Sequence, residues 1–129
     1  MQSGTVRSDQ APAAVGPYSQ ARWASNMLFL SGQIGLEPAT GQLVSGGVEA
    51  QAGQAMRNLT AVLKAAGLSW DQVVKVNIFL TDMADFAAVN QVYAGFFAQG
   101  AALPARACVA VAGLPKAAAV EIEAVACQG

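Results

Sequence analysis

The spacing of apolar and polar residues changes several times along this chain and indicates that strands alternate with helices. A period of two predicts five strands, over residues 18–24, 27–33, 73–80, 106–112 and 120–127. Apolar residues recur at helical spacing from 48 to 66 and again from about 82 to 97. The order is therefore strand, strand, helix, strand, helix, strand, strand.

Local residues support these boundaries. Ser25 and Asn26 form a candidate two-residue turn between the first two strands. Gly67 stands where a glycine follows the end of a helix, and Lys64 lies in the last turn, where a cation suits the helix dipole. Thr81 or Asp82 is expected to cap the second helix.

The side-chain pattern also predicts what is buried. Leu28 and Leu30 share one face of their strand. The strand over 73–80 is expected to bury Val74, Val76, Ile78 and Leu80 on one face. Six further large residues are expected in the core: Met56, Phe79, Phe86, Tyr93, Phe96 and Phe97. Such a chain suggests an α+β fold, with one mixed sheet, both helices on one face and the other face free for subunit contacts.

Size and charge narrow the class of protein. The 129 residues predict a single domain over 1–129, with residues 1–10 as a loose or edge segment. Hydrophobic residues make up 54% and charged residues 12%, which excludes disorder and favours a homo-oligomer that covers the apolar surplus. The formal net charge of -1 provides no basic field for nucleic acid. No signal peptide or membrane span is apparent, so a cytoplasmic protein is expected.

Few residues are available for catalysis or metal binding. The chain has no histidine, and its two cysteines, Cys108 and Cys127, lack metal-ligand or disulfide-framework spacing, so no metal is expected. Arg106 and Cys108 share one face of a predicted strand, and Glu121 shares a face of the next strand with Glu123. If those strands are antiparallel neighbours, the arginine can lie near a carboxylate.

Two interpretations of this arrangement stay open from spacing alone. One is a structural ion pair on a solvated sheet face. The other is a site in which the planar guanidinium of Arg106 grips a substrate carboxylate while a glutamate activates water.

Several ordered motifs run through residues 11–126. The opening motif is Ala13-Ala14-Val15-Gly16-Pro17-Tyr18-Ser19-Gln20-Ala21. Later motifs are Ser31-Gly32-Gln33-Ile34, Pro38-Ala39-Thr40-Gly41, the helix from Gln51 to Gly67, Val73-Val74-Lys75, Asp82-Met83-Ala84-Asp85-Phe86, Asn90, Tyr93, Phe96-Phe97, Pro104-Ala105-Arg106-Ala107-Cys108-Val109, Leu114-Pro115-Lys116 and Val120-Glu121-Ile122-Glu123. Together these motifs resemble the RidA (YjgF) family of reactive-intermediate imine deaminases.

The resemblance implies a chorismate-mutase-like α+β fold, a homotrimer with ligand sites between subunits, and cofactor-independent hydrolysis of 2-aminoacrylate and related enamines or imines to 2-oxo acids and ammonia. It implies that Arg106 clamps the substrate carboxylate and that Glu121 orients the attacking water. Five further residues would line the cleft: Tyr18, Ser31, Gly32, Asn90 and Cys108.

Each lining residue also has a structural interpretation. Tyr18 is an aromatic body that packs, Ser31 serves the bend after its strand, Asn90 caps or bridges structure, and Cys108 is a small buried hydrophobe. The segment between Phe97 and Pro104 is about one residue shorter than the family pattern suggests, and Arg22-Trp23 is bulkier. The shorter segment is expected to lie near the cleft, where it would affect substrate preference.

Two alternatives compete with the deaminase. The first is a non-catalytic trimeric module that binds 2-oxo acids through Arg106 and regulates a partner enzyme; the presence of Glu121 favours the enzyme over it. The second is a ribonuclease, which the lack of histidine and of a basic surface disfavours.

Overall fold

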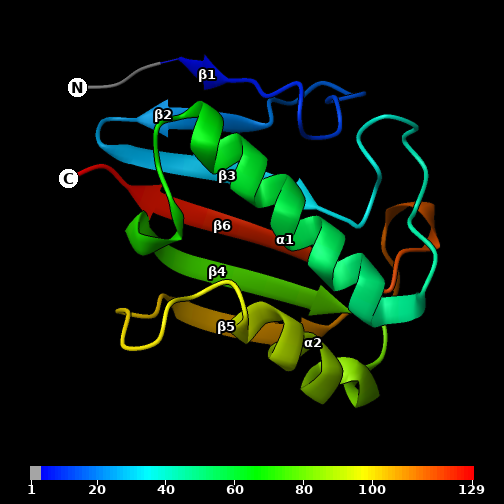
Figure 1. The fold of residues 1–129 in the computed structure, drawn as a ribbon. Coiled ribbons are helices and arrows are strands. Elements are labelled where there is room, and N and C mark those ends of the chain that lie inside the picture. Colours follow the sequence, from blue (N-terminus) through cyan, green and yellow to red (C-terminus); the bar gives the residue numbers. More distant parts are fainter. Residues whose placement is uncertain (1–3) are drawn as a thin grey trace.

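A computed structural model of the chain describes residues 4–129. These residues contain one six-stranded mixed sheet in the order β1-β2-β3-β6-β4-β5 (Figure 1). Strand bounds are β1 Thr5–Val6, β2 Ala21–Ala24, β3 Met27–Gln33, β4 Val73–Leu80, β5 Ala105–Ala110 and β6 Val120–Cys127. Strands β4 and β5 are parallel, and the other pairs are antiparallel.

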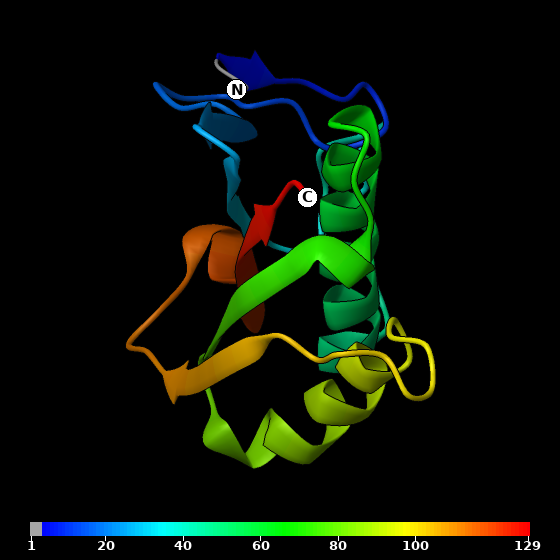
Figure 2. The same cartoon turned by 90° about the vertical axis from the view of Figure 1, so that its left-hand side faces the viewer.

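Two helices, α1 (Gly47–Ala65) and α2 (Phe86–Ala94), cover the same face of the sheet (Figure 2). Short 3-10 helices lie at Trp70–Gln72, Met83–Asp85 and Pro115–Ala117. The predicted α+β architecture, with both helices on one face, is confirmed. We call the side of the sheet that α1 and α2 cover the helix face, and the opposite side the open face.

Helix α1 forms where its apolar period predicts, because its inward residues are all removed from water. Met56, Leu59, Val62 and Leu63 have no solvent exposure, and burial of each such side chain stabilises the fold by about 1.5–3 kcal/mol. Gly67 ends the helix with φ +78°, while the N–H of Leu68 donates to the carbonyl of Leu63 at 2.9 Å.

The first hairpin has the predicted two-residue turn, since Ala24 pairs with Met27. Ser25, rather than Asn26, takes the positive φ of 57°. Leu28 and Leu30, which were predicted to share one face of the strand, are both buried on the helix face. The predicted strand over 18–24 is too long, because regular pairing begins only at Ala21.

Residues 18–20 instead join the N-terminal segment to the sheet. Gln20 is buried, and its side chain accepts a hydrogen bond from the N–H of Ser8 at 2.7 Å and donates to the carbonyl of Pro12 at 2.8 Å. Strand β1 pairs with β2 at the edge of the sheet. Of the predicted N-terminal segment 1–10, residues 1–3 lie outside the described part.

Strand β4 contains an irregularity that corrects one prediction. The register of β4 against β6 shifts between Val73 and Lys75, so Val73 is buried while Val74 is 44% exposed. Val76, Ile78 and Leu80 are buried as predicted. Phe79 and Phe86 were also predicted in the core, but Phe79 is only partly buried on the open face and Phe86 is 38% exposed.

Strands β5 and β6 are not neighbours, because β4 lies between them. Helix α2 connects β4 to β5, and a connection of this length lets the two strands run parallel. The condition under which Arg106 could lie near a carboxylate of the last strand, that the two strands are antiparallel neighbours, is therefore not met. No helix in residues 4–129 has the length and apolar character needed to cross a membrane.

Candidate functional site

Arg106 lies on β5 and reaches the helix face, where α2 holds its guanidinium. Its Nη1 donates a hydrogen bond to Oδ1 of Asn90 at 2.7 Å. Its Cζ lies 5.0 Å from the ring centre of Tyr93 and 5.7 Å from that of Phe86, both within cation–π range. The register supports this direction, because Arg106 pairs with Val76, which is fully buried.

The guanidinium keeps its positive charge available. Within residues 4–129 the one ion pair joins Arg7 and Asp9 at 3.4 Å on the surface, so Arg106 has no carboxylate partner there. A cavity of about 630 Å³ opens beside it. Its walls are formed by Asn90, Tyr93, Ala94, Phe97, Ala98, Gln99, Gly100, Ala101, Leu103, Pro104 and Arg106. The cavity beside Arg106 therefore presents one positive charge among uncharged residues.

Two titratable groups next to Arg106 are held in their neutral forms. Burial raises the pKa of Tyr93, and the positive charge of Arg106 offsets part of that rise. Burial likewise raises the pKa of Cys108, again partly offset by Arg106. Cys108 packs against the hydrophobic core, and the described walls of the cavity do not include it. The geometry thus favours its interpretation as a small apolar residue.

Glu121 forms the centre of a second cluster, at Gly32. The β3–β6 register shifts between Leu30 and Gln33, which brings the backbone of Gly32 against the Glu121 side chain. A Cβ atom at Gly32 would overlap Oε2 of Glu121 and lie 2.9 Å from its Cδ, so glycine leaves room for the carboxylate in its present position.

The surroundings of Glu121 make its carboxyl easier to protonate. Burial raises the pKa of Glu121, and the nearby charge of Glu123 raises it further. Glu123 itself accepts a hydrogen bond from Nδ2 of Asn77 at 3.0 Å. A carboxyl shifted in this direction exchanges protons more readily near neutral pH than an ordinary glutamate does.

Tyr18 and Ser31 lie near this second cluster. Both border a cavity of about 480 Å³ that also includes Arg22, Phe29 and Glu123. Tyr18 is 54% exposed. The hydroxyl of Ser31 donates to the carbonyl of Ser19 at 2.6 Å, so it ties the segment before β2 to β3, at the end of the hairpin away from its turn. This contact is structural, but it is not the bend after the strand that was expected of Ser31.

The two clusters lie on opposite faces of one sheet. Val120 and Ile122 of β6 are fully buried toward the helices, so Glu121 between them points to the open face. Arg106 points to the helix face, as its contacts with α2 show. One chain therefore brings Arg106 together with Asn90, and Glu121 together with Gly32, but it does not bring the arginine to the glutamate.

Sequence reasoning placed Phe86 and Tyr93 in the core and missed their contacts with Arg106. Their spacing with Asn90, at positions i, i+4 and i+7 of a helix, was the available signal. No group of three or more His, Cys, Asp or Glu side chains in residues 4–129 has a metal-binding arrangement.

Comparison with known proteins identifies the family. A model of the family described as Endoribonuclease L-PSP matches residues 8–128. The chain belongs to this family. The motif resemblance to RidA (YjgF) proteins is confirmed, since a solved RidA from an Antarctic Psychrobacter is 46% identical with a TM-score of 0.91, covering 97% of this chain and 99% of that one.

Two more members of the RidA family are informative by name. A curated protein of Mus musculus named 2-iminobutanoate/2-iminopropanoate deaminase is 52% identical over 124 residues, which are 96% of this chain and 90% of that protein. The structure of Escherichia coli TdcF with bound serine matches with a TM-score of 0.92 and 42% identity, covering 98% of this chain and 99% of that one.

Proposed function

We propose that this protein hydrolyses 2-aminoacrylate-type enamines and imines to 2-oxo acids and ammonia, at sites between the subunits of a homotrimer. The observation that carries the proposal is the Arg106 guanidinium, which is held by an amide and two aromatic rings and faces a cavity with no carboxylate to neutralise it. A guanidinium in these surroundings is suited to bind a small carboxylate by two parallel hydrogen bonds.

The reaction follows from an imine whose carboxylate is fixed in this way. A water held by the Glu121 carboxylate gives that group a proton and adds its oxygen to C2, forming a C–O bond while the C=N electron pair moves to nitrogen. Glu121 returns the proton to nitrogen. Glu121 then takes the proton of the new hydroxyl and passes it to the amine, so the hydroxyl becomes the carbonyl of the 2-oxo acid as the C–N bond breaks and ammonia leaves. An enamine enters this sequence after protonation of its terminal carbon gives the imine.

The other site residues supply position in this scheme. Asn90 holds Arg106, and Gly32 leaves room for the Glu121 carboxylate. Tyr18, Ser31 and the backbone around Gly32 would line one wall of the cleft, and Cys108 would lie behind Arg106. Positioning and one carboxylate suffice because an imine is already electrophilic. The scheme uses no metal and no cofactor.

Assembly is part of the proposal because each chain carries the two halves on opposite faces. A second copy must supply the missing half, and cyclic symmetry would then complete one site at each interface. The open face suits such contacts, since it exposes Phe29 by 50% and Val109 by 47%.

The names of relatives support hydrolysis of imines over cleavage of RNA. The mouse protein is named as an imine deaminase, whereas the family description names an endoribonuclease. This chain has no histidine and seven Lys and Arg residues against eight acidic ones. It therefore lacks the common acid–base side chain and a basic surface for phosphates.

A coupled assay tests the activity. A pyridoxal-phosphate serine dehydratase generates 2-aminoacrylate, and the rate of imine loss is followed with and without the protein. Arg106→Ala and Glu121→Gln should abolish the acceleration. Arg57→Ala and Glu49→Gln, which alter exposed residues of α1, should retain it. A folded wild-type protein that binds a 2-oxo acid without accelerating imine loss would favour the regulatory module instead.

A mixing experiment tests the shared site. Arg106→Ala and Glu121→Gln chains are refolded together, and about one quarter of the sites should then combine an intact arginine with an intact glutamate. Recovery of activity in the mixture, with each variant inactive alone, supports sites between subunits. Light scattering should give about three times the chain mass of 13.1 kDa. A monomeric mass for active protein would refute the assembly.

A further inference from the structure

Three side chains on one side of helix α2 contact Arg106. Phe86, Asn90 and Tyr93 stand at positions i, i+4 and i+7, so they project from the same side of the helix. All three contact the guanidinium: the amide by a 2.7 Å hydrogen bond, and the rings at 5.7 and 5.0 Å from Cζ. The register of β5 against β4 places Arg106 beneath them.

We propose that Phe86 and Tyr93 are positioning residues that set the orientation of the Arg106 guanidinium for carboxylate binding. The inference rests on the proposed function, because it assumes that Arg106 binds the substrate carboxylate. Aromatic faces attract a cation through their quadrupole. Unlike an aspartate or glutamate partner, they hold the guanidinium without cancelling the charge that the substrate needs.

The two rings differ in how they are fixed. Tyr93 is buried, and its ring lies 4.9 Å from that of Phe97, which in turn lies 5.4 Å from Trp70. Trp70 donates its indole N–H to Oγ1 of Thr60 at 2.8 Å, so this aromatic cluster is anchored to α1. Tyr93 thus gives the guanidinium a rigid support.

Phe86 is the better of the two rings for a mutational test, because it is the more exposed. It begins α2 and is 38% exposed, although it is a large apolar side chain. Its ring packs over Arg106 and gains little from core burial, so its replacement should leave folding intact. The two rings and Asn90 restrict the orientation of the guanidinium before the substrate binds. Without them this ordering would take place on binding, and its entropy cost would reduce the affinity for substrate.

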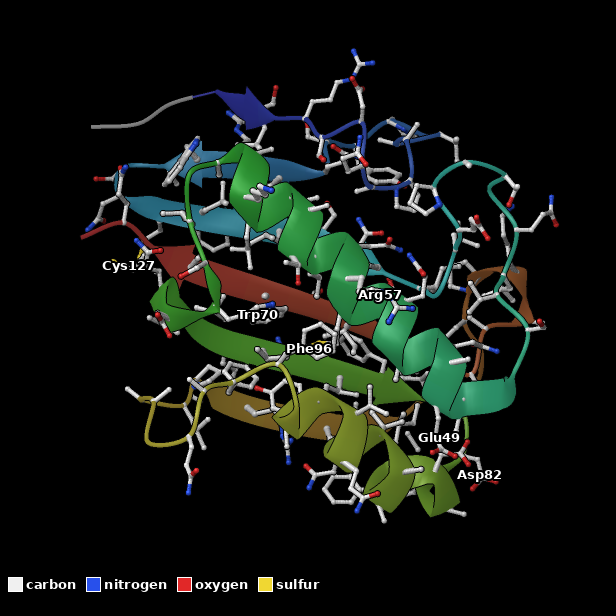
Figure 3. All side chains as sticks on the ribbon, viewed as in Figure 1. Glu49, Arg57, Trp70, Asp82, Phe96 and Cys127 are labelled. Carbon is white, nitrogen blue, oxygen red and sulfur yellow. The ribbon has the colours of Figure 1, made fainter. Side chains whose placement is uncertain are left out.

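The test compares ring-removing and ring-preserving variants. Phe86→Leu removes the ring but keeps apolar volume, Phe86→Tyr restores a ring, and Tyr93→Phe keeps the ring without its hydroxyl. Phe96→Leu is the matched control. Phe96 lies just after α2, and its ring centre is 6.3 Å from that of Trp70 (Figure 3). The aromatic rings described against Arg106 are those of Phe86 and Tyr93. Two measurements are made on each variant: KM and kcat in the coupled assay, and Kd for 2-oxobutanoate by calorimetry.

Phe86→Leu should raise both KM and Kd about fivefold, the order of a partly desolvated cation–π contact, with kcat changed less than about twofold. Phe86→Tyr and Tyr93→Phe, which keep a ring beside Arg106, should hold KM and Kd within about twofold of wild type. Phe96→Leu, which lies outside the site, should match wild type in both. A wild-type Kd and KM for Phe86→Leu would overturn this inference and leave the role of Arg106 untouched. Undiminished binding of 2-oxobutanoate by Arg106→Ala would overturn both.

Discussion

Replacement of Gly32 by alanine should separate activity from stability. In the native structure a Cβ at this position would overlap Oε2 of Glu121 and would lie 2.9 Å from Cδ and 3.1 Å from Cγ. Non-bonded heavy atoms prefer to approach no closer than about 3.5 Å, so the carboxylate must retreat by roughly 1 Å. A displacement of that size in a group that positions the attacking water is expected to lower kcat by about 100-fold.

The stability of the same variant should change little. Gly32 does not have a positive φ, so alanine fits its backbone. Alanine at a compatible site stabilises a protein by about 0.4–1 kcal/mol because it restricts the unfolded chain. The displaced glutamate opposes this gain, and it is only partly buried and free to shift. The free energy of unfolding should therefore change by less than about 1 kcal/mol.

The measurement pairs the dehydratase-coupled assay with urea denaturation. Gly113→Ala is the matched control, since no heavy atom lies within 4 Å of a Cβ there and its φ is also not positive. It should match wild type in both assays. Wild-type kcat for Gly32→Ala would show that the position of Glu121 does not limit the reaction, and would refute its assignment as the water-binding carboxylate.

Three other changes have defined outcomes. The pKa of Glu121 is raised in the folded chain, so from about pH 4.5 up to its folded pKa the folded state binds more protons than the unfolded state. The free energy of unfolding should therefore fall as the pH rises through that range. Denaturation at a series of pH values in which Glu121→Gln shows the same slope as wild type would contradict this. Arg106→Lys should lower kcat/KM about tenfold or more because an ammonium lacks the planar fork; near-normal kinetics would refute a bidentate clamp. Asn58 is 1% exposed and donates to the carbonyls of Ile34 and Leu36. Asn58→Ala should therefore lower the free energy of unfolding, measured by urea denaturation, by about 2 kcal/mol. A decrease below about 0.5 kcal/mol would show that those carbonyls find other partners.

Periodicity predicted the elements whose burial is regular. Helix α1 has an apolar side that sets its position, and Gly67 marks its end, so both were accessible from sequence. Pattern failed where the chain is irregular. The register shift near Val74 exchanges the face of one residue, and nothing in the alternation signals it.

The arrangement of the site depended on long-range topology, which local patterns do not contain. Arg106 and Glu121 were identified as chemically suitable residues, but β4 lies between their strands. The registers pair Arg106 with the buried Val76 and Glu121 with Phe79 on the opposite face. Phe86 and Tyr93 were assigned to the core because aromatic residues at helical spacing usually pack there. The same spacing also allows them to contact a cation. Only the position of β5 beneath α2 distinguishes the two.

The central place of β6 has a consequence for synthesis of the chain. This strand is the last of the six to be translated, yet it pairs on both edges, with β3 and with β4. Met27 pairs with Cys127, one hundred residues later in the chain. The sheet therefore cannot close until β6 has emerged from the ribosome, and until then the growing chain exposes two strand edges that can pair with other chains.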